Sequence, residues 1–183
     1  MTKKILVLGF HGSSGSLQNR KNTFAGYVKK RIKESSKSIV FIEFFSFFRI
    51  STIVREIMEK HYDDFSGIMF IGKSVGATKI FDVLENVKIF NRVVDYQKRV
   101  IVTIDPHYPF GIYGPNKPID FDLFSPLIPV FNIRQISKYP RGAVVKGALN
   151  ETIHKSNVNH WNIVKQPETI SVIEKGFQYV EIF

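Results

Sequence analysis

The segment from residue 67 to residue 87 constrains the fold most, because one tight turn separates an unbroken apolar run from a helical pattern. The run over 67–71 is short and bulky, which is typical of a strand buried on both faces. Beyond the turn, apolar residues recur three or four positions apart, and this spacing predicts an amphipathic helix. Apolar runs and helical periods alternate in the same way along most of the chain. The alternation predicts an α/β fold with a doubly wound, mostly parallel sheet of about five or six strands.

Apolar runs predict strands over residues 4–9, 38–44, 67–71, 99–104 and 129–134. Helical periods predict helices over residues 17–33, 51–61, 77–87 and 167–175. A further short strand or hairpin arm is expected within 141–148, and a long aromatic and proline-rich loop over 106–127. The chain has 183 residues, 44% of them hydrophobic, and no linker or repeat, so we expect one domain over 1–183. Its active site should lie at the carboxyl ends of the strands.

The composition excludes several kinds of site. The sequence contains no cysteine, which excludes disulfides, thiolate metal sites and a cysteine nucleophile, and which fits a cytoplasmic protein. No apolar run reaches the length of a membrane span. Part of the net charge of +10 gathers around the helix expected over 17–33, but no aromatic stacking pattern interleaves with these charges. We therefore expect a solvated helix face there and no nucleic-acid partner.

The turn after residues 67–71 reads Gly72-Lys73-Ser74-Val75-Gly76, a G-x-S-x-G sequence between a strand and a helix. Because Gly72 and Gly76 lack a Cβ, the strand and the helix can approach closely around a strained serine. Ser74 would then present its Oγ at the carboxyl edge of the sheet. This is the arrangement of a nucleophile elbow, and it makes Ser74 the predicted nucleophile. An ordinary glycine-rich turn also fits the motif taken alone.

The same residues satisfy a second pattern. Residues 67–74 read GIMFIGKS, which fits the G-x-x-x-x-G-K-S of phosphate-binding P-loops in nucleotide-binding proteins. That loop would place the large apolar side chains of 68–71 in solvent, and it would need the polar residues 61–66 as its preceding strand. The strand context therefore favours the nucleophile elbow.

A serine nucleophile needs a general base, and five histidines compete for this role. His160 is the predicted base, because it precedes the last helix by a short loop and fits the chain order nucleophile, acid, base. His154 lies in the same segment and is the fallback. His107 directly follows the fourth strand, within reach of the site. His11 and His61 are expected to be structural.

The acid that orients the base is predicted to be Asp105, which ends the strand beside the elbow. Glu151, in the histidine segment itself, is the fallback acid. Under the P-loop interpretation, Asp105 would instead be the carboxylate on the magnesium side of a nucleotide.

Two backbone N–H groups are expected to stabilise the oxyanion. One belongs to Val75, the residue after the nucleophile. The other belongs to Ser13, or less favourably to Gly12, in the glycine- and serine-rich turn over 9–16 that also holds His11. A loop that cradles phosphate before a helix is the alternative for this turn.

These motifs together resemble those of small α/β-hydrolases of the lipase and esterase type. The resemblance is carried by Gly-Phe-His-Gly at 9–12, the G-x-S-x-G at 72–76, Ile-Asp-Pro at 104–106 and the late His160. The aspartate–proline pair after the strand that follows the elbow is similar to animal lipases of the pancreatic type. Lys73 departs from the family, which often has histidine there, and the chain is shorter than larger members. The resemblance implies a minimal α/β-hydrolase.

The sequence thus favours a serine esterase or lipase-like hydrolase that cleaves a carboxylic ester or related acyl bond of a small molecule. Ser74, His160 and Asp105 would form its triad, with no metal or organic cofactor required. The candidates for an acyl pocket, or for the core, are the aromatic residues of 106–127 and the phenylalanines after the second strand, Phe44, Phe45, Phe47 and Phe48. The alternatives are a P-loop nucleotide-binding protein and a hydrolase-like binding module without catalysis. The sequence leaves the acyl and leaving groups and the oligomeric state open.

Overall fold

The computed structural model describes residues 3–12, 23–45, 56, 64–86, 99–108, 119, 128–138 and 140–182. Several predictions lie outside these ranges. They concern the oxyanion donor Ser13, His61, the helix over 51–61 apart from Glu56, and the 106–127 loop apart from its first residues and Ile119.

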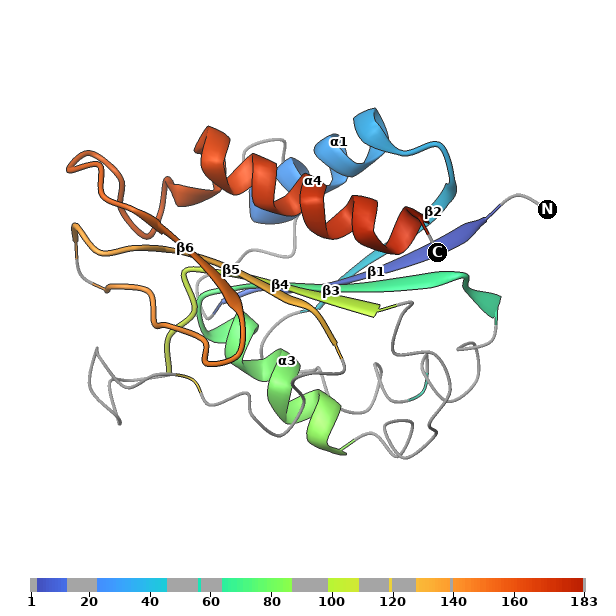
Figure 1. Cartoon of the computed structure of the whole chain (residues 1–183), viewed down its shortest axis with the longest axis horizontal. Helices are drawn as coiled ribbons and strands as arrows, with labels where there is room; N and C mark the ends of the chain where they lie inside the picture. The colour runs from blue at the N-terminus through green and yellow to red at the C-terminus, as the bar shows by residue number, and fades with distance from the viewer. Residues whose placement is uncertain are drawn as a thin grey trace.

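The described residues form one parallel sheet of six strands in the order β2-β1-β3-β4-β5-β6 (Figure 1). Every neighbouring pair is parallel. The strands are β1 (Lys4–Phe10), β2 (Ile39–Phe45), β3 (Gly67–Lys73), β4 (Arg99–Ile104), β5 (Val130–Gln135) and β6 (Leu149–Ile153). Because β1, β3 and β4 lie inside the sheet and are covered on both faces, they are almost wholly apolar and buried. The predicted α/β class with a mostly parallel sheet is confirmed.

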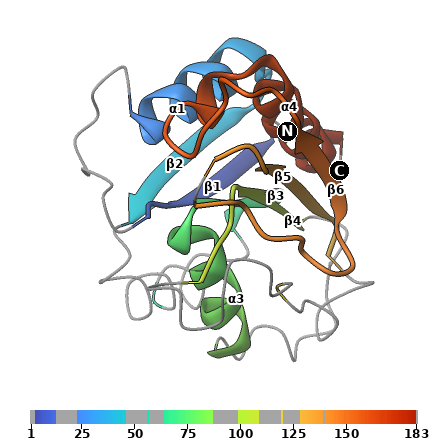
Figure 2. The same ribbon diagram turned by 90° about the vertical axis from the view of Figure 1, so that its left-hand side faces the viewer.

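Helices cover both faces of this sheet. They are α1 (Phe24–Ser35), α3 (Val75–Asn86) and α4 (Pro167–Ile182), preceded by the short 3-10 helix η5 (Ile163–Lys165). The helices α1 and α4 pack on one face and α3 packs on the other (Figure 1). Turned by 90°, the molecule shows α1 on the β2 side and α4 on the β6 side (Figure 2). Two apolar clusters fill the two layers, as a doubly wound sheet requires. No described helix has the length and apolarity needed to cross a membrane.

The helix α1 begins at Phe24, after the cap residue Thr23, whose hydroxyl accepts a hydrogen bond from the Gly26 N–H at 3.2 Å. Lys30 and Lys33 of this helix are exposed, and Lys30 and Arg31 form ion pairs with Glu34. These contacts agree with the solvated helix face expected from the sequence.

Two boundaries differ from the sequence predictions. The sixth strand is not within 141–148 but at Leu149–Ile153, and it runs parallel to β5 instead of forming a hairpin arm. A turn at Gly147, which has a φ of 79°, separates it from the preceding segment. The last helix continues seven residues beyond 175, from Gly176 to Ile182. Gly176 lies inside this helix. A Cβ there would lie 2.5 Å from Val102 Cγ2, so the glycine lets the helix pack closely on the sheet.

Candidate active site

Ser74 lies between β3 and α3, at the carboxyl edge of the sheet. Its φ of 62° places a residue with a Cβ in the left-handed region, which costs about 1–2 kcal/mol and persists only where the surroundings enforce it. The enforcing contact is with β4, since the Ser74 N–H donates to the Ile104 carbonyl at 2.9 Å. The P-loop interpretation is wrong, because residues 68–71 are buried inside β3 and form no loop.

The glycines around this turn make room for it. A Cβ on Gly72 would lie 2.6 Å from Ala77 Cα, and one on Gly76 would lie 2.4 Å from the Phe10 carbonyl oxygen. Both distances are too short for a real side chain, so strand β3, helix α3 and the end of β1 meet here only because both residues are glycine. The G-x-S-x-G spacing therefore has a steric cause in this fold.

Asp105 follows β4 directly and lies next to Ser74 in the sheet. Its carboxylate is fully buried, and Oδ2 lies 2.6 Å from Nδ1 of His160. The two residues are 55 positions apart in the sequence. The structure thus brings together the acid and the base that the sequence singled out, in the geometry that orients an imidazole.

The Asp105 carboxylate is held from its other side by β5. Oδ1 accepts a hydrogen bond from the Gln135 N–H at 3.0 Å, and the Gln135 side chain donates to the carbonyl oxygens of Lys138 and Pro140 at 2.7 and 2.6 Å. Gly142 passes so close that a Cβ on it would lie 2.2 Å from Oδ1. These contacts fix the position of a buried charge, which burial alone would disfavour.

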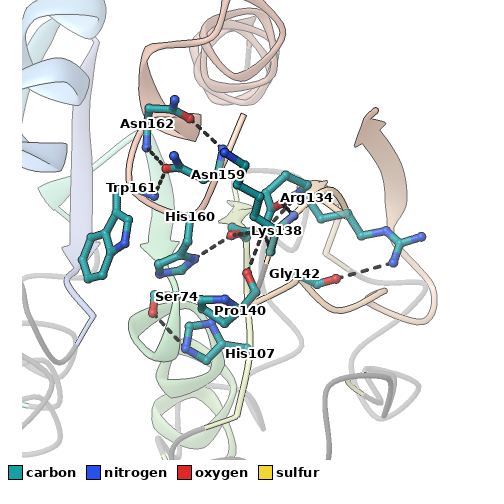
Figure 3. Close-up of polar contacts among 12 residues, drawn as sticks. Ser74, His107, Arg134, Lys138, Pro140, Gly142, Asn159, His160, Trp161 and Asn162 are labelled. Carbon is teal, nitrogen blue, oxygen red and sulfur yellow. Dashed lines mark hydrogen bonds and ion pairs between the residues drawn. The ribbon is translucent and has the colours of Figure 1, made fainter. Parts of the chain in front are cut away.

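His160 is held by a turn of asparagines. Oδ1 of Asn159 accepts hydrogen bonds from the N–H groups of Trp161 and Asn162 at 2.9 and 3.0 Å, and Oδ1 of Asn162 accepts from the Asn159 N–H at 2.8 Å (Figure 3). Asn162 also donates to the Asn157 carbonyl at 2.9 Å. This reciprocal pattern satisfies the backbone of the loop before η5 and directs His160 toward Asp105.

The hydroxyl of Ser74 contacts a different histidine from the one expected. Ser74 Oγ lies 3.3 Å from Nε2 of His107, and the His107 and His160 rings pack edge to face with centroids 4.9 Å apart (Figure 3). The expected hydrogen bond between Ser74 and His160 is not formed. His107 lies two residues after Asp105, whose backbone is left-handed with a φ of 48°.

The surroundings of the two histidines differ. Burial, and next the nearby His160, lower the pKa of His107, against an opposing effect of Asp105. Nδ1 of His107 is buried without a hydrogen-bond partner among the described residues, whereas Nδ1 of His160 faces a carboxylate. His160 is thus better equipped to carry a positive charge after it accepts a proton.

The remaining predicted residues are placed as follows. Glu151 lies on β6 and pairs with Lys175 of α4 at 2.9 Å, and His154 is exposed. His11 is buried between Phe24 and Phe44, and burial is the first cause that lowers its pKa. Neither Glu151 nor His154 contacts Ser74, Asp105 or His160.

Val75 begins α3, so its N–H has no acceptor within the helix and is available beside Ser74. Among the described residues, no three histidine, aspartate or glutamate side chains lie together as a metal site would require.

The order of the strands and the turn at Ser74 define an α/β-hydrolase-like fold. The chain is similar in structure to an arylesterase, with a TM-score of 0.57 and 14% sequence identity, over 100% of this chain and 76% of the arylesterase. At this identity the similarity concerns the fold alone. No protein-family model and no curated protein matches the sequence.

We expect Gly12→Ala to damage the site without unfolding the protein. A Cβ at position 12 would lie 2.8 Å from Ser74 Cβ and 2.9 Å from Ser74 Oγ, so the serine would have to move. A displacement of that kind costs about 100-fold in reaction rate. The rate of labelling by a fluorophosphonate measures the loss, and thermal unfolding provides the control. Unchanged labelling would show that the segment after β1 does not constrain the serine.

Proposed function

We propose that this protein is a serine hydrolase that cleaves a carboxylic ester or related acyl bond. The observation that carries the proposal is the combination of a strained serine at the sheet edge with a buried Asp105–His160 pair beside it. Neither feature stabilises the fold by itself, since a left-handed serine and a buried carboxylate both cost free energy. Their occurrence together is typical of a catalytic site.

In the proposed reaction, Ser74 Oγ attacks the acyl carbon while Nε2 of His160 accepts the serine proton. Asp105 holds Nδ1–H of His160 and stabilises the imidazolium. The Val75 N–H, with the Ser13 N–H as second donor, stabilises the oxyanion. His160 then gives the proton to the departing alcohol, which leaves an acyl-enzyme, and water attacks this ester by the reverse sequence of proton transfers.

For this reaction Ser74 has to turn from His107 toward His160. Catalytic hydrogen bonds are often long or misaligned before substrate binds, so the contact with His107 is compatible with the proposal. The lowered pKa of His107 and its lack of a carboxylate partner favour His160 as the base.

The contact between Ser74 and His107 also supports a second candidate, a binding module in which the elbow remains without catalysis. Ser74 is only 6% exposed and already has a hydrogen-bond partner. Incubation with a fluorophosphonate, together with a panel of p-nitrophenyl esters, separates the two candidates. A hydrolase is labelled at Ser74 and turns over at least one ester, whereas a binding module does neither.

We expect Asp105→Asn to lower turnover by roughly four orders of magnitude. The amide keeps the size of the side chain, but its NH₂ group cannot accept the proton of Nδ1, so His160 adopts the wrong tautomer. The matched control is Glu151→Gln, which removes a carboxylate at the Lys175 ion pair and should leave turnover unchanged. The opposite result, a collapse in Glu151→Gln alone, would transfer the role of the acid to Glu151.

A further inference from the structure

Lys73 is the last residue of β3 and directly precedes Ser74. Side chains alternate along a strand, so Lys73 lies on the same face as Met69 and Ile71, the face covered by α1 and α4. Its Nζ lies 5.8 Å from the ring centroid of Trp161, the residue after His160. The lysine therefore reaches from the elbow to the histidine turn. Trp161 is 64% exposed, so this contact lies at the mouth of the site.

Within the described part of the chain Lys73 forms no ion pair, and the carboxylate that acts on it is Asp105, which is already bonded to His160 and Gln135. Burial lowers the pKa of Lys73 to about 8, and the attraction of Asp105 opposes this shift. Lys73 is a partly buried cation whose attracting carboxylate is already bonded elsewhere, and this costs free energy that an anionic ligand would recover.

Other cations gather on the same side. Burial lowers the pKa of His11, and the charges of Lys73 and Lys29 lower it further. Lys29 also lies over Phe44, at 5.7 Å from its ring centroid. Lys165 of η5 lies over Tyr27 of α1, at 5.9 Å. This face of the sheet combines amines with aromatic rings, and the net charge of +10 adds a long-range attraction for anions.

We propose that Lys73 and Trp161 form a recognition site for a negatively charged group of the substrate, so that the preferred substrate is an ester carrying a carboxylate or similar anion. This inference rests on the proposed ester hydrolysis. Lys73 would bind the anion by a charge-assisted hydrogen bond, and Trp161 would cover the adjacent apolar part. The departure from the histidine that often precedes the nucleophile would then have a role in substrate choice.

Two matched pairs of esters test the preference on the intact protein. Monophenyl adipate and phenyl hexanoate differ by a carboxylate on the acyl side, and 3-carboxyphenyl acetate and 3-methylphenyl acetate differ by one on the leaving side. In at least one pair we expect kcat/KM to be roughly 10- to 100-fold higher for the anionic ester, as for a hydrogen bond to a charged group. The pair that shows the preference tells which side of the ester faces Lys73.

Variants assign the preference to Lys73. In Lys73→Met the ratio of kcat/KM for anionic to neutral ester should fall to about one, because methionine has a similar length and no charge. Lys175→Met removes an exposed lysine of α4 and is the control for net charge, and its ratio should equal that of the wild type. Trp161→Leu should reduce the preference only in part.

The pH dependence gives a second test, in which the charge of Lys73 is removed by titration instead of by mutation. The lysine is charged below its pKa and neutral above it, so the wild-type preference should decline as the pH rises through about 8. In Lys73→Arg it should persist at pH 9, because a guanidinium stays charged. The titratable groups that act near the lysine are Asp105, His11 and His107. The pKa values of both histidines are lowered, so neither histidine changes its charge as the pH rises through about 8.

The outcomes separate the two proposals. If no ester is turned over and no fluorophosphonate is bound, the proposed hydrolase function is wrong, and the inference fails with it. If neutral and anionic esters are turned over equally well, only the recognition site is wrong. If Lys73→Met is misfolded, the role of Lys73 is tested by the pH dependence of the ratio in the wild type and in Lys73→Arg. A wild-type preference that does not change with pH would overturn the role of Lys73.

Discussion

Ser74→Ala is expected to lower ester turnover by about a million-fold and to abolish fluorophosphonate labelling. The loss is large because no other hydroxyl stands at the sheet edge beside Asp105 and His160 within the described residues. The stability should change little. Serine and alanine both have a Cβ, so the strain at a φ of 62° is the same in both proteins, and only the contact of Oγ with His107 is lost. We expect a change in the free energy of unfolding of less than about 1.5 kcal/mol.

Ser74→Gly is the matched variant for this experiment. Glycine adopts the left-handed conformation without strain, so the variant should lose activity as completely as Ser74→Ala while unfolding at the same or a higher temperature. Turnover is measured with the best ester of the panel, and stability by thermal unfolding. Near-normal turnover in both variants would mean that another residue is the nucleophile, and the elbow would then be only a structural turn.

The order of the elements could be predicted from the sequence, because the central strands carry a strong signal. The strands β3 and β4 are buried on both faces, and a run of large apolar residues is the direct consequence. The edge strand β6 was missed because Leu149–Ile153 is half polar, and its conformation is set by its pairing with β5. The prediction for α4 ended before Gly176, a residue with a low helix propensity, whereas the close packing of Gly176 on Val102 is a tertiary effect.

The position of the candidate site followed from topology. Parallel strands end at one edge, so Ser74 and Asp105 had to be neighbours, and a histidine before the last helix could reach them. The contact of Ser74 with His107 could not be ranked from the sequence, because the local pattern gives no sign of the left-handed backbone at Asp105, two residues before the histidine. The supports of the pair, Gln135 and Asn159, were also missed. Asparagines spaced two and three apart before η5 were a usable signal for a hydrogen-bonded turn.

The second large expected effect distinguishes the roles of His160 and His107. His160→Ala should reduce turnover about as much as Ser74→Ala, because the nucleophile and the base act as one unit. His107→Ala should cost no more than about tenfold, the value of one ordinary hydrogen bond, because Asp105 and His160 remain in place. His154→Ala, at an exposed position, is the control and should have no effect.

The physical reason for this difference is the partner of each ring. When an imidazole accepts the serine proton it becomes a cation in a buried site, and only His160 then has a carboxylate at 2.6 Å to stabilise the charge. Burial and the neighbouring His160 lower the pKa of His107, so the protonation of His107 is disfavoured. Turnover in the three variants, measured with the same ester, ranks the histidines. A collapse in His107→Ala with mild loss in His160→Ala would make His107 the base, and the Asp105–His160 pair would then be a structural support of the site.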